Sequence, residues 1–336
     1  MKNSDKRNRF TQQFNAISKN IFTLPLSGKI LQGWVLLTGQ IVISGGTTNG
    51  TATGDGGPVN LIRRIIVNAI PAANSRYPGG KIVDCSPRAL LRYAIFQHNG
   101  KYFDALAGSG LGSGAAGTYN VYLAIPIYWA DANLRRQVST ALNADPTAYQ
   151  TIQVEVDTGT STDCFAGNDR TWNFSGLQVQ WIDERENFGG DTLVRFQEDH
   201  IFLIPAANKR ALDNAMPLDG SFESILYLAE QNTSQTLADT ILNRVQMAGS
   251  TLDYDLYAND IRQNMFDDEW LDPSQSAAGH FFIDFTDGLV GGSVPAGDLQ
   301  IQLDLNNPSG SNLDQLRVYT RRLFSPVGYQ PAAVGK

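Results

Sequence analysis

The sequence contains an internal repeat, which constrains its fold more than any other feature. The stretch Pro-Leu-x-Gly begins at Pro25 and again at Pro217, and an apolar strand-like segment follows both copies. Four further segments recur in the same order, and the spacing falls steadily from 192 residues (217 − 25) to 139 (316 − 177). These matches begin at Leu61 and Ile241, Leu90 and Asp260, Ile152 and Ile301, and Leu177 and Leu316. Five ordered matches indicate two copies of one fold.

The repeat also predicts the domain organisation. A falling spacing means that the loops of the first copy are longer, and the Gly-rich stretches 45–57 and 108–117 fit such extra length. We expect an N-terminal arm, a first domain, a short linker, a second domain and a C-terminal tail. Their predicted bounds are 1–20, 21–187, 188–196, 197–325 and 326–336.

Each copy combines several short strand patterns with one helix pattern. Gly, Pro, Asn and Asp separate the apolar or alternating segments, which is typical of a sandwich or barrel. In the first copy Ser86 is placed to cap a helix that begins at Pro87. In the second copy Ala258, Ile261 and Met265 recur at helical spacing. The sequence therefore predicts an all-β protein of two tandem eight-stranded jelly rolls, each with a short helix insertion.

Composition narrows the class of protein. Charged residues make up only 18% of the 336 residues, which suggests that other copies cover much of the surface. The net charge of −7 argues against a general nucleic-acid binder. Two cysteines, Cys85 and Cys164, are too few for a disulfide scaffold. No stretch has the pattern of a signal peptide or the roughly 18 apolar residues of a membrane span, so we expect a protein made or assembled in a reducing cytoplasm.

Motifs for metal or cofactor binding are lacking. The histidines His98, His200 and His280 are far apart, whereas a metal-binding double jelly roll clusters its histidines on one strand. The stretch GSGAAG at 112–117 precedes a strand pattern instead of a helix, so a flexible loop is the better interpretation than a phosphate site. We expect no cofactor and no metal site.

Catalytic motifs are lacking too. Carboxylates gather at 181–186, 197–200 and 266–270, but neighbours in sequence do not form the opposed pair of a glycosidase. Solvated or salt-bridged roles fit them better. Neither cysteine has a sequence context that would activate it, and no G-x-S-x-G elbow is present. We therefore expect no catalytic residue, and a protein that is not an enzyme.

Two adjacent arginines interrupt a strand that is otherwise apolar on both faces. Arg63 and Arg64 point to opposite faces of the strand pattern at 59–67. Arg64 lines up with Arg244 in the second copy. One interpretation is an interface, in which these arginines meet a neighbouring jelly roll or subunit; the other is a structural salt bridge within one domain.

The N-terminal arm is basic and has a short apolar stripe. Phe10, Phe14, Ile17 and Ile21 recur at helical spacing. A basic amphipathic segment can lie on an anionic membrane or on nucleic acid, whereas a solvated terminus is the alternative. The residues that would face the membrane or genome are Lys2, Lys6, Arg7, Arg9, Phe10 and Phe14.

Two tandem jelly rolls, each with a helix between strands, a basic arm and no catalytic constellation resemble the double jelly-roll major capsid proteins of tailless icosahedral viruses, including bacteriophages with an internal membrane. The resemblance implies a homotrimer of pseudo-hexagonal outline, whose barrels stand perpendicular to an icosahedral shell. It also implies neighbouring trimers, other capsid and vertex proteins, and an internal membrane or the genome as partners. The location implied is the virion, assembled in the host cytoplasm.

Two other classes also use such folds. A secreted glycan-processing enzyme of the peptide-N-glycosidase type would carry an acidic cleft and, usually, disulfides. A lectin-like binding module would expose aromatic residues on its loops, whereas the tryptophans of this sequence mostly lie in or beside strand patterns. The sequence favours the capsid protein over both.

Overall fold

The structure is a computed structural model, and it describes most of the chain. The described residues are 6–97, 111, 114–130, 138–187, 189–204, 210–231, 236–249, 253–267, 278–286, 294–297, 299–307 and 314–326. Lys2, His98, half of the stretch 108–117 and nearly all of the predicted tail lie outside them. The side chains of Lys6 and Arg7 are also outside the description.

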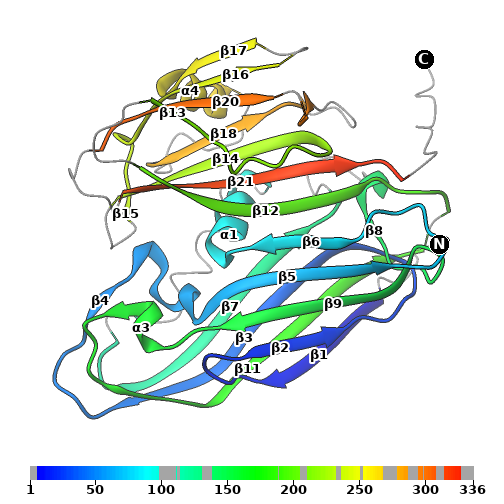
Figure 1. The fold of residues 1–336 in the computed structure, drawn as a ribbon. Helices are drawn as coiled ribbons and strands as arrows, with labels where there is room; N and C mark the ends of the chain where they lie inside the picture. The colour runs from blue at the N-terminus through cyan, green and yellow to red at the C-terminus, as the bar shows by residue number, and fades with distance from the viewer. Residues whose placement is uncertain are drawn as a thin grey trace.

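The first half of the chain forms two facing antiparallel sheets (Figure 1). One sheet has the order β1 (Lys6–Gln13), β11 (Thr171–Glu186), β3 (Lys29–Ser44), β7 (Gly117–Tyr128), with β8 (Leu142–Asn143) beside β3. The other has the order β2 (Lys19–Thr23), β9 (Tyr149–Thr158), β5 (Ile62–Pro71), β6 (Gly80–Cys85). The remaining elements are β4 (Thr51–Ala52), which pairs with β10 (Phe165–Ala166), and the helices η1 (Gly54–Leu61), α1 (Pro87–Gln97), η2 (Val138–Thr140) and α3 (Ser161–Cys164).

The second half repeats this arrangement. One sheet has the order β12 (Val194–Leu203), β21 (Gln315–Phe324), β14 (Ser221–Gln231), β18 (His280–Asp284), and β14 also pairs with β15 (Thr236–Leu237) and β19 (Val294–Pro295). The other has the order β13 (Arg210–Leu212), β20 (Gln300–Leu305), β16 (Leu242–Ala248), β17 (Asp253–Tyr257). The helix α4 (Ala258–Asp267) follows β17, as α1 follows β6.

The two halves therefore match strand for strand. In order, β1, β2, β3, β5, β6, β7, β9 and β11 correspond to β12, β13, β14, β16, β17, β18, β20 and β21. Each of the five repeated sequence segments falls on an equivalent pair of elements. The predicted fold, two tandem eight-stranded jelly rolls with a helix insertion in each, is confirmed.

The backbone conformation explains why both copies of the Pro-Leu-x-Gly stretch end in glycine. Gly28 and Gly220 have φ angles of +69° and +73°, a left-handed conformation that other residues rarely adopt. A Cβ atom would also lie 2.7 Å from the Asn187 side chain at the first site and 2.8 Å from the Phe324 ring at the second. Both glycines turn the chain into the long strand that follows.

The helices form where the sequence predicts them. The Ser86 hydroxyl accepts a hydrogen bond from the backbone N–H of Ala89 at 3.3 Å and so caps α1. In α4 the apolar stripe of Ala258, Ile261 and Met265 is buried. The helix α1 lies between the two jelly rolls (Figure 1), and its residues are buried on every side.

The helical prediction for the N-terminal arm is wrong. Residues Lys6–Gln13 form the edge strand β1, paired with β11, and residues Lys19–Thr23 form β2. The even spacing of Phe10 and Phe14 suits one face of a strand as well as one face of a helix. Phe14 is buried and packs against Phe174 in a tilted arrangement, with ring centroids 5.1 Å apart. Ile17 is exposed, so the predicted stripe is not buried as a unit.

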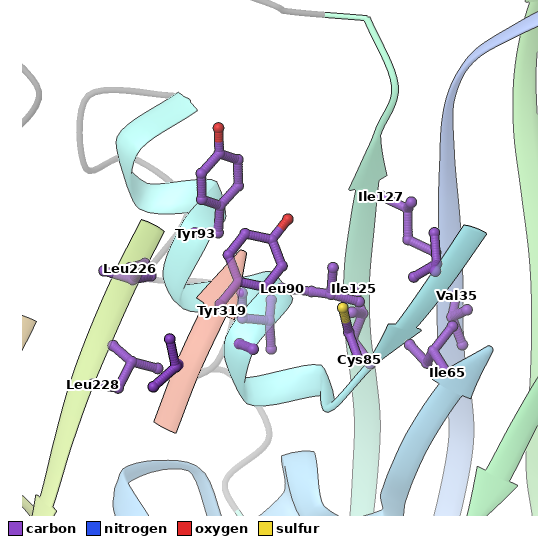
Figure 2. Close-up of a cluster of buried hydrophobic side chains, with 14 of the residues drawn as sticks. Val35, Ile65, Cys85, Leu90, Tyr93, Ile125, Ile127, Leu226, Leu228 and Tyr319 are labelled. Atoms are coloured by element: carbon purple, nitrogen blue, oxygen red, sulfur yellow. The ribbon is translucent and has the colours of Figure 1, made fainter. Parts of the chain in front are cut away.

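A continuous apolar core runs through both jelly rolls and the contact between them. Figure 2 shows Leu90 and Tyr93 of α1 facing Leu226 of β14 and Tyr319 of β21. The rings of Tyr93 and Tyr319 have centroids 4.9 Å apart. This packing holds the second jelly roll against the helix of the first.

Candidate functional site

The two jelly rolls meet at a junction, which is the most elaborate polar site in the described part of the chain. The edge strand β6 of the first pairs in parallel with the edge strand β12 of the second, with Val83 opposite Gln197 and Asp84 opposite Glu198. One sheet of each jelly roll is thereby joined into a single ten-stranded sheet. At the junction the two strand edges pair with each other, and α1 of the first jelly roll packs against the second jelly roll.

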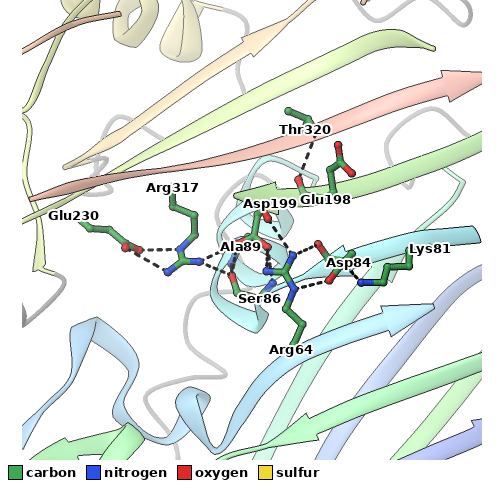
Figure 3. Close-up of polar contacts among 10 residues, drawn as sticks. All are labelled: Arg64, Lys81, Asp84, Ser86, Ala89, Glu198, Asp199, Glu230, Arg317 and Thr320. Atoms are coloured by element: carbon green, nitrogen blue, oxygen red, sulfur yellow. Dashed lines mark hydrogen bonds and ion pairs between the residues drawn. The ribbon is translucent and has the colours of Figure 1, made fainter. Parts of the chain in front are cut away.

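Arg64 connects the two edge strands. Its guanidinium pairs with the carboxylate of Asp84 on β6 and lies 2.7 Å from the carboxylate of Asp199 on β12. It also donates to the backbone carbonyl of Asp199 at 3.0 Å. Figure 3 shows this fork between the two strands. A planar guanidinium with several donors suits such bidentate contacts.

The network continues into the second jelly roll. Arg317 of β21 lies 2.9 Å from the second carboxylate oxygen of Asp199 and 3.2 Å from Glu230 of β14. Glu230 also pairs with Arg88 of α1 at 3.1 Å. Ser86 donates to Asp199 from both its backbone N–H and its hydroxyl, at 2.8 Å and 2.7 Å. One buried carboxylate thus accepts bonds from three elements (Figure 3).

Electrostatics explains why these charges are stable inside the protein. Burial raises the pKa of the Asp199 carboxyl, but Arg317 and Arg64 outweigh this effect and hold it below its ordinary value of 3.8. Burial lowers the pKa of Arg317, but Glu230 and Asp199 outweigh it and raise the pKa above its ordinary value. Both groups therefore stay charged at neutral pH, each stabilised by the other.

A second polar cluster lies farther along the same face of β12. The guanidinium of Arg195 forms two 2.6 Å bonds to the carboxylate of Glu223 and also donates to the carbonyl of Trp129 in the first jelly roll. Gln197 donates to the carbonyl of Tyr128 at 3.1 Å. These bonds tie β12 to backbone carbonyls at the end of β7, and the Trp129 carbonyl also accepts from the Thr140 hydroxyl at 2.6 Å.

The other two predicted arginines lie away from this network. Arg63 makes an exposed ion pair with Asp163 of α3 at 2.8 Å. Arg244 pairs with Asp255 of β17 and stacks over the ring of Tyr257, 5.3 Å from its centroid. The structure thus brings Arg64 into the junction. Arg63 lines the same cavity of about 430 Å³ as Arg64, Ser86 and Arg317, whereas Arg244 lies within the second jelly roll. A role of these three arginines at an interface between subunits stays a prediction.

Four of the residues named for the predicted arm, Lys6, Arg7, Arg9 and Phe10, lie on β1, and Phe14 directly follows it. Arg9 is exposed and donates to the Gln180 side chain at 2.6 Å, and Phe10 packs on the core. The backbone of Lys6 and Arg7 continues the same strand. The contact of this segment with a membrane or genome stays a prediction.

The acidic clusters are structural where the structure describes them. Asp183 binds Arg185 at 2.8 Å and the indole N–H of Trp181 at 3.0 Å, and Asp199 belongs to the junction. The side chains of 266–270 lie outside the described residues.

The described histidines and cysteines are buried or make local contacts. No group of three or more His, Cys, Asp or Glu residues there could hold a metal ion. His200 pairs with Asp213 at 3.0 Å, and the His280 ring contacts the carbonyl of Ala278. Burial raises the pKa of the Cys85 and Cys164 thiols, so neither is an activated nucleophile. In the same part of the chain no helix has the length and apolarity to cross a membrane.

Sequence reasoning missed most of the junction. Asp199 lies in the acidic stretch 197–200 and Ser86 in the predicted cap, so both positions carried a signal. Arg317 and Glu230 carried none, because their partners lie 118 and 87 residues away in the chain. The buried charges become visible only once the strands are placed.

Comparisons with known proteins support the fold. No protein-family model and no curated protein matches the chain. Among solved structures, the STIV MCP is similar with a TM-score of 0.68 and 15% identity, over 98% of this chain and 100% of that one. The Faustovirus major capsid protein has a TM-score of 0.59 and 9% identity, over 96% and 91%.

The major capsid protein of bacteriophage PM2 has a TM-score of 0.56 and 12% identity, over 96% of this chain and 100% of that one. At these identities the likeness concerns the fold, and it extends over nearly the whole length of each protein. The chain therefore has the double jelly-roll fold of these viral capsid proteins.

Proposed function

We propose that this protein is a major capsid protein, a building block that assembles with copies of itself into an icosahedral shell. The observation that carries the proposal is the full-length double jelly-roll fold, which it shares with solved capsid proteins from several viruses. The charges at the junction are buried and paired with one another. This arrangement suits a rigid building block.

The geometry of the junction supports self-assembly. It joins the helix side of the first jelly roll to a sheet face and edge of the second, so the two contacting surfaces differ. Because the two jelly rolls are equivalent units, the same contact can be repeated between one chain and the next. Such head-to-tail contacts form a ring when the rotations from unit to unit add up to a full turn. Six units, or three chains, close a ring at about 60° per unit. A homotrimer of pseudo-hexagonal outline follows from the proposal.

The partners and location follow from the same role. Trimers would contact neighbouring trimers and other capsid and vertex proteins in the virion, after assembly in the host cytoplasm. The N-terminal end of the chain would face an internal membrane or the genome, because Lys2, Lys6 and Arg7 make it basic. We propose no catalytic activity for the protein. Neither a glycan-processing enzyme nor a lectin is favoured by a feature of the structure.

Light scattering of the purified protein at several concentrations, with a glycan-release assay on the same sample, tests the proposal. A particle of about 110 kDa, three times the 36.7 kDa chain, or a larger shell visible by electron microscopy, is expected, with no glycan release. A monomer at every concentration, or release of glycans, would overturn the proposal.

A further inference from the structure

The strands β1 and β17 are two of the open sheet edges in the described part of the chain. Among the described residues, β17 pairs only with β16, and β1 pairs only with β11. Figure 1 shows β17 at one end of the molecule and β1 at the opposite end, so the two cannot meet within one chain. An open edge presents unpaired backbone N–H and C=O groups and readily adds a strand from another chain.

The internal repeat makes these two edges equivalent to the two that already pair. By strand order β17 corresponds to β6 and β1 corresponds to β12. Within the chain, β6 and β12 join in parallel. The same join between copies would link β17 of one copy to β1 of the next.

The register of the second join can be read from the first. On the β1 side, Arg9 lies opposite Ile182, and Gln197 lies opposite Arg321. Ile182 and Arg321 occupy the same position of the repeat, so Arg9 is the equivalent of Gln197. On the β17 side, Tyr254 lies opposite Met247, and Val83 lies opposite Val67. Met247 and Val67 occupy the same position of the repeat, so Tyr254 is the equivalent of Val83.

Because Val83 lies opposite Gln197 in the existing join, Arg9 of one copy would lie opposite Tyr254 of another. By the same shift of one residue, Phe10 would lie opposite Asp255. A guanidinium over a tyrosine ring is a favourable pair at such a position.

The ion pair that fixes β6 has a counterpart on β17. Asp84 of β6 binds Arg64, and in the same place of the repeat Asp255 of β17 binds Arg244. The pair on β17 is more open, since the side chain of Asp255 is 48% exposed. A copy of β1 placed beside it would cover this pair, as β12 covers the first.

The two edges also have opposite charge. The strand β1 carries Lys6, Arg7 and Arg9 and no carboxylate, whereas β17 carries Asp253 and Asp255 and no cation. Unlike charges on facing edges favour the pairing of β1 with β17 over the pairing of either strand with itself.

The edge strand β17 also exposes two aromatic side chains. Tyr254 is 40% exposed and Tyr257 is 56% exposed. Exposed aromatic residues are enriched at protein interfaces, where their rings become buried.

We propose that β17 of one copy pairs in parallel with β1 of a second copy, with Tyr254 opposite Arg9, and that this strand join is the contact between subunits. The inference rests on the proposed self-assembly and specifies its interface. The intermolecular join is weaker than the one within the chain, because Thr11 replaces the buried carboxylate of Asp199 at the equivalent position.

Disulfide cross-linking tests the register. The double variant Arg9→Cys/Tyr254→Cys brings two thiols onto neighbouring strands about 4.8 Å apart, within the range that a disulfide spans. The native Cys85 and Cys164 are fully buried and do not compete. Mild oxidation should give covalent dimers and trimers on a non-reducing gel.

The matched control is Gln13→Cys/Tyr254→Cys, which moves one thiol about 13 Å along the same face of β1. It should give no ladder. A wild-type protein that is trimeric by light scattering while the first variant stays uncross-linked, or cross-links no better than the control, would overturn the strand join but not the proposed function. A monomeric wild type would overturn the proposed function itself.

A charge reversal gives a second, independent test. Arg9→Glu should raise the concentration at which the oligomer dissociates by about tenfold or more. Lys19→Glu, which makes the same charge change on the edge strand β2, should leave it nearly unchanged. Unaltered assembly of Arg9→Glu, with loss of binding to vesicles of anionic lipid, would assign β1 to a membrane surface and overturn the strand join.

Discussion

Arg64 of the first jelly roll lies 2.7 Å from Asp199 of the second, although 135 residues separate the two in the chain. The Asp199 side chain is completely buried, and Arg317 approaches it from the other side at 2.9 Å. Their attraction fixes β6 beside β12 and hence one jelly roll against the other. The same carboxylate would be costly to bury without these two partners.

Removal of the Asp199 charge should therefore destabilise the protein strongly. In Asp199→Asn, two guanidinium groups remain at the junction without their shared carboxylate, and we expect a loss of about 3–5 kcal/mol in the free energy of unfolding. Urea denaturation measures it. The control Glu155→Gln breaks the exposed pair with Lys19 and should cost about 0–1 kcal/mol. Equal losses in the two variants would contradict the role given to the junction.

The stabilisation from Asp199 should depend on pH in a defined direction. Its pKa in the folded protein lies below the ordinary value of 3.8, because Arg317 and Arg64 outweigh the effect of burial. A carboxyl of lowered pKa stabilises the native state above its unfolded pKa, and this contribution is lost as the pH falls through the native pKa.

The difference in unfolding free energy between wild type and Asp199→Asn should thus be constant above about pH 5 and shrink below about pH 4. Urea titrations of both proteins over this range measure it. A difference that persists unchanged to about pH 2, or that grows in acid, would show that Asp199 is not held charged by its arginines.

The glycines of the repeated Pro-Leu-x-Gly stretch should tolerate no side chain. At Gly28 and Gly220, alanine would adopt a left-handed conformation and meet atoms closer than 3 Å, so each Gly→Ala variant should lose about 1–2 kcal/mol or more. Thermal unfolding checks this. Gly189→Ala is the control, because its Cβ would meet no atom within 4 Å. Loss of stability in the control alone would refute the argument.

The apolar contact between α1 and β14 should contribute as much as the ionic one. Leu226 is fully buried against α1 (Figure 2), and Leu226→Ala should cost about 2–5 kcal/mol through the cavity that it leaves. Leu218 is 68% exposed, and the matched change Leu218→Ala should cost less than about 0.5 kcal/mol. Similar losses of stability in the two variants would contradict the role given to the contact between α1 and β14.

The repeated segments of the sequence predict the fold, whereas the structure of the N-terminal arm and the partners of the junction residues could not be predicted. The five matched segments identified equivalent strands and helices in both halves, because each copy must solve the same packing problem. The spacing of Phe10 and Phe14 fits both the helix period and the strand period, and only pairing with β11 decides between them. The partner of Arg64 could not be predicted, since nothing in the sequence near Asp199 indicates which strand lies beside it.

An electron cryomicroscopy reconstruction of the purified oligomer tests the central claim most directly. We expect a ring of three chains and six jelly rolls, in which β17 of each chain continues the sheet of the next chain at β1. A ring with another number of chains, or one in which β17 and β1 both face solvent, would contradict the account.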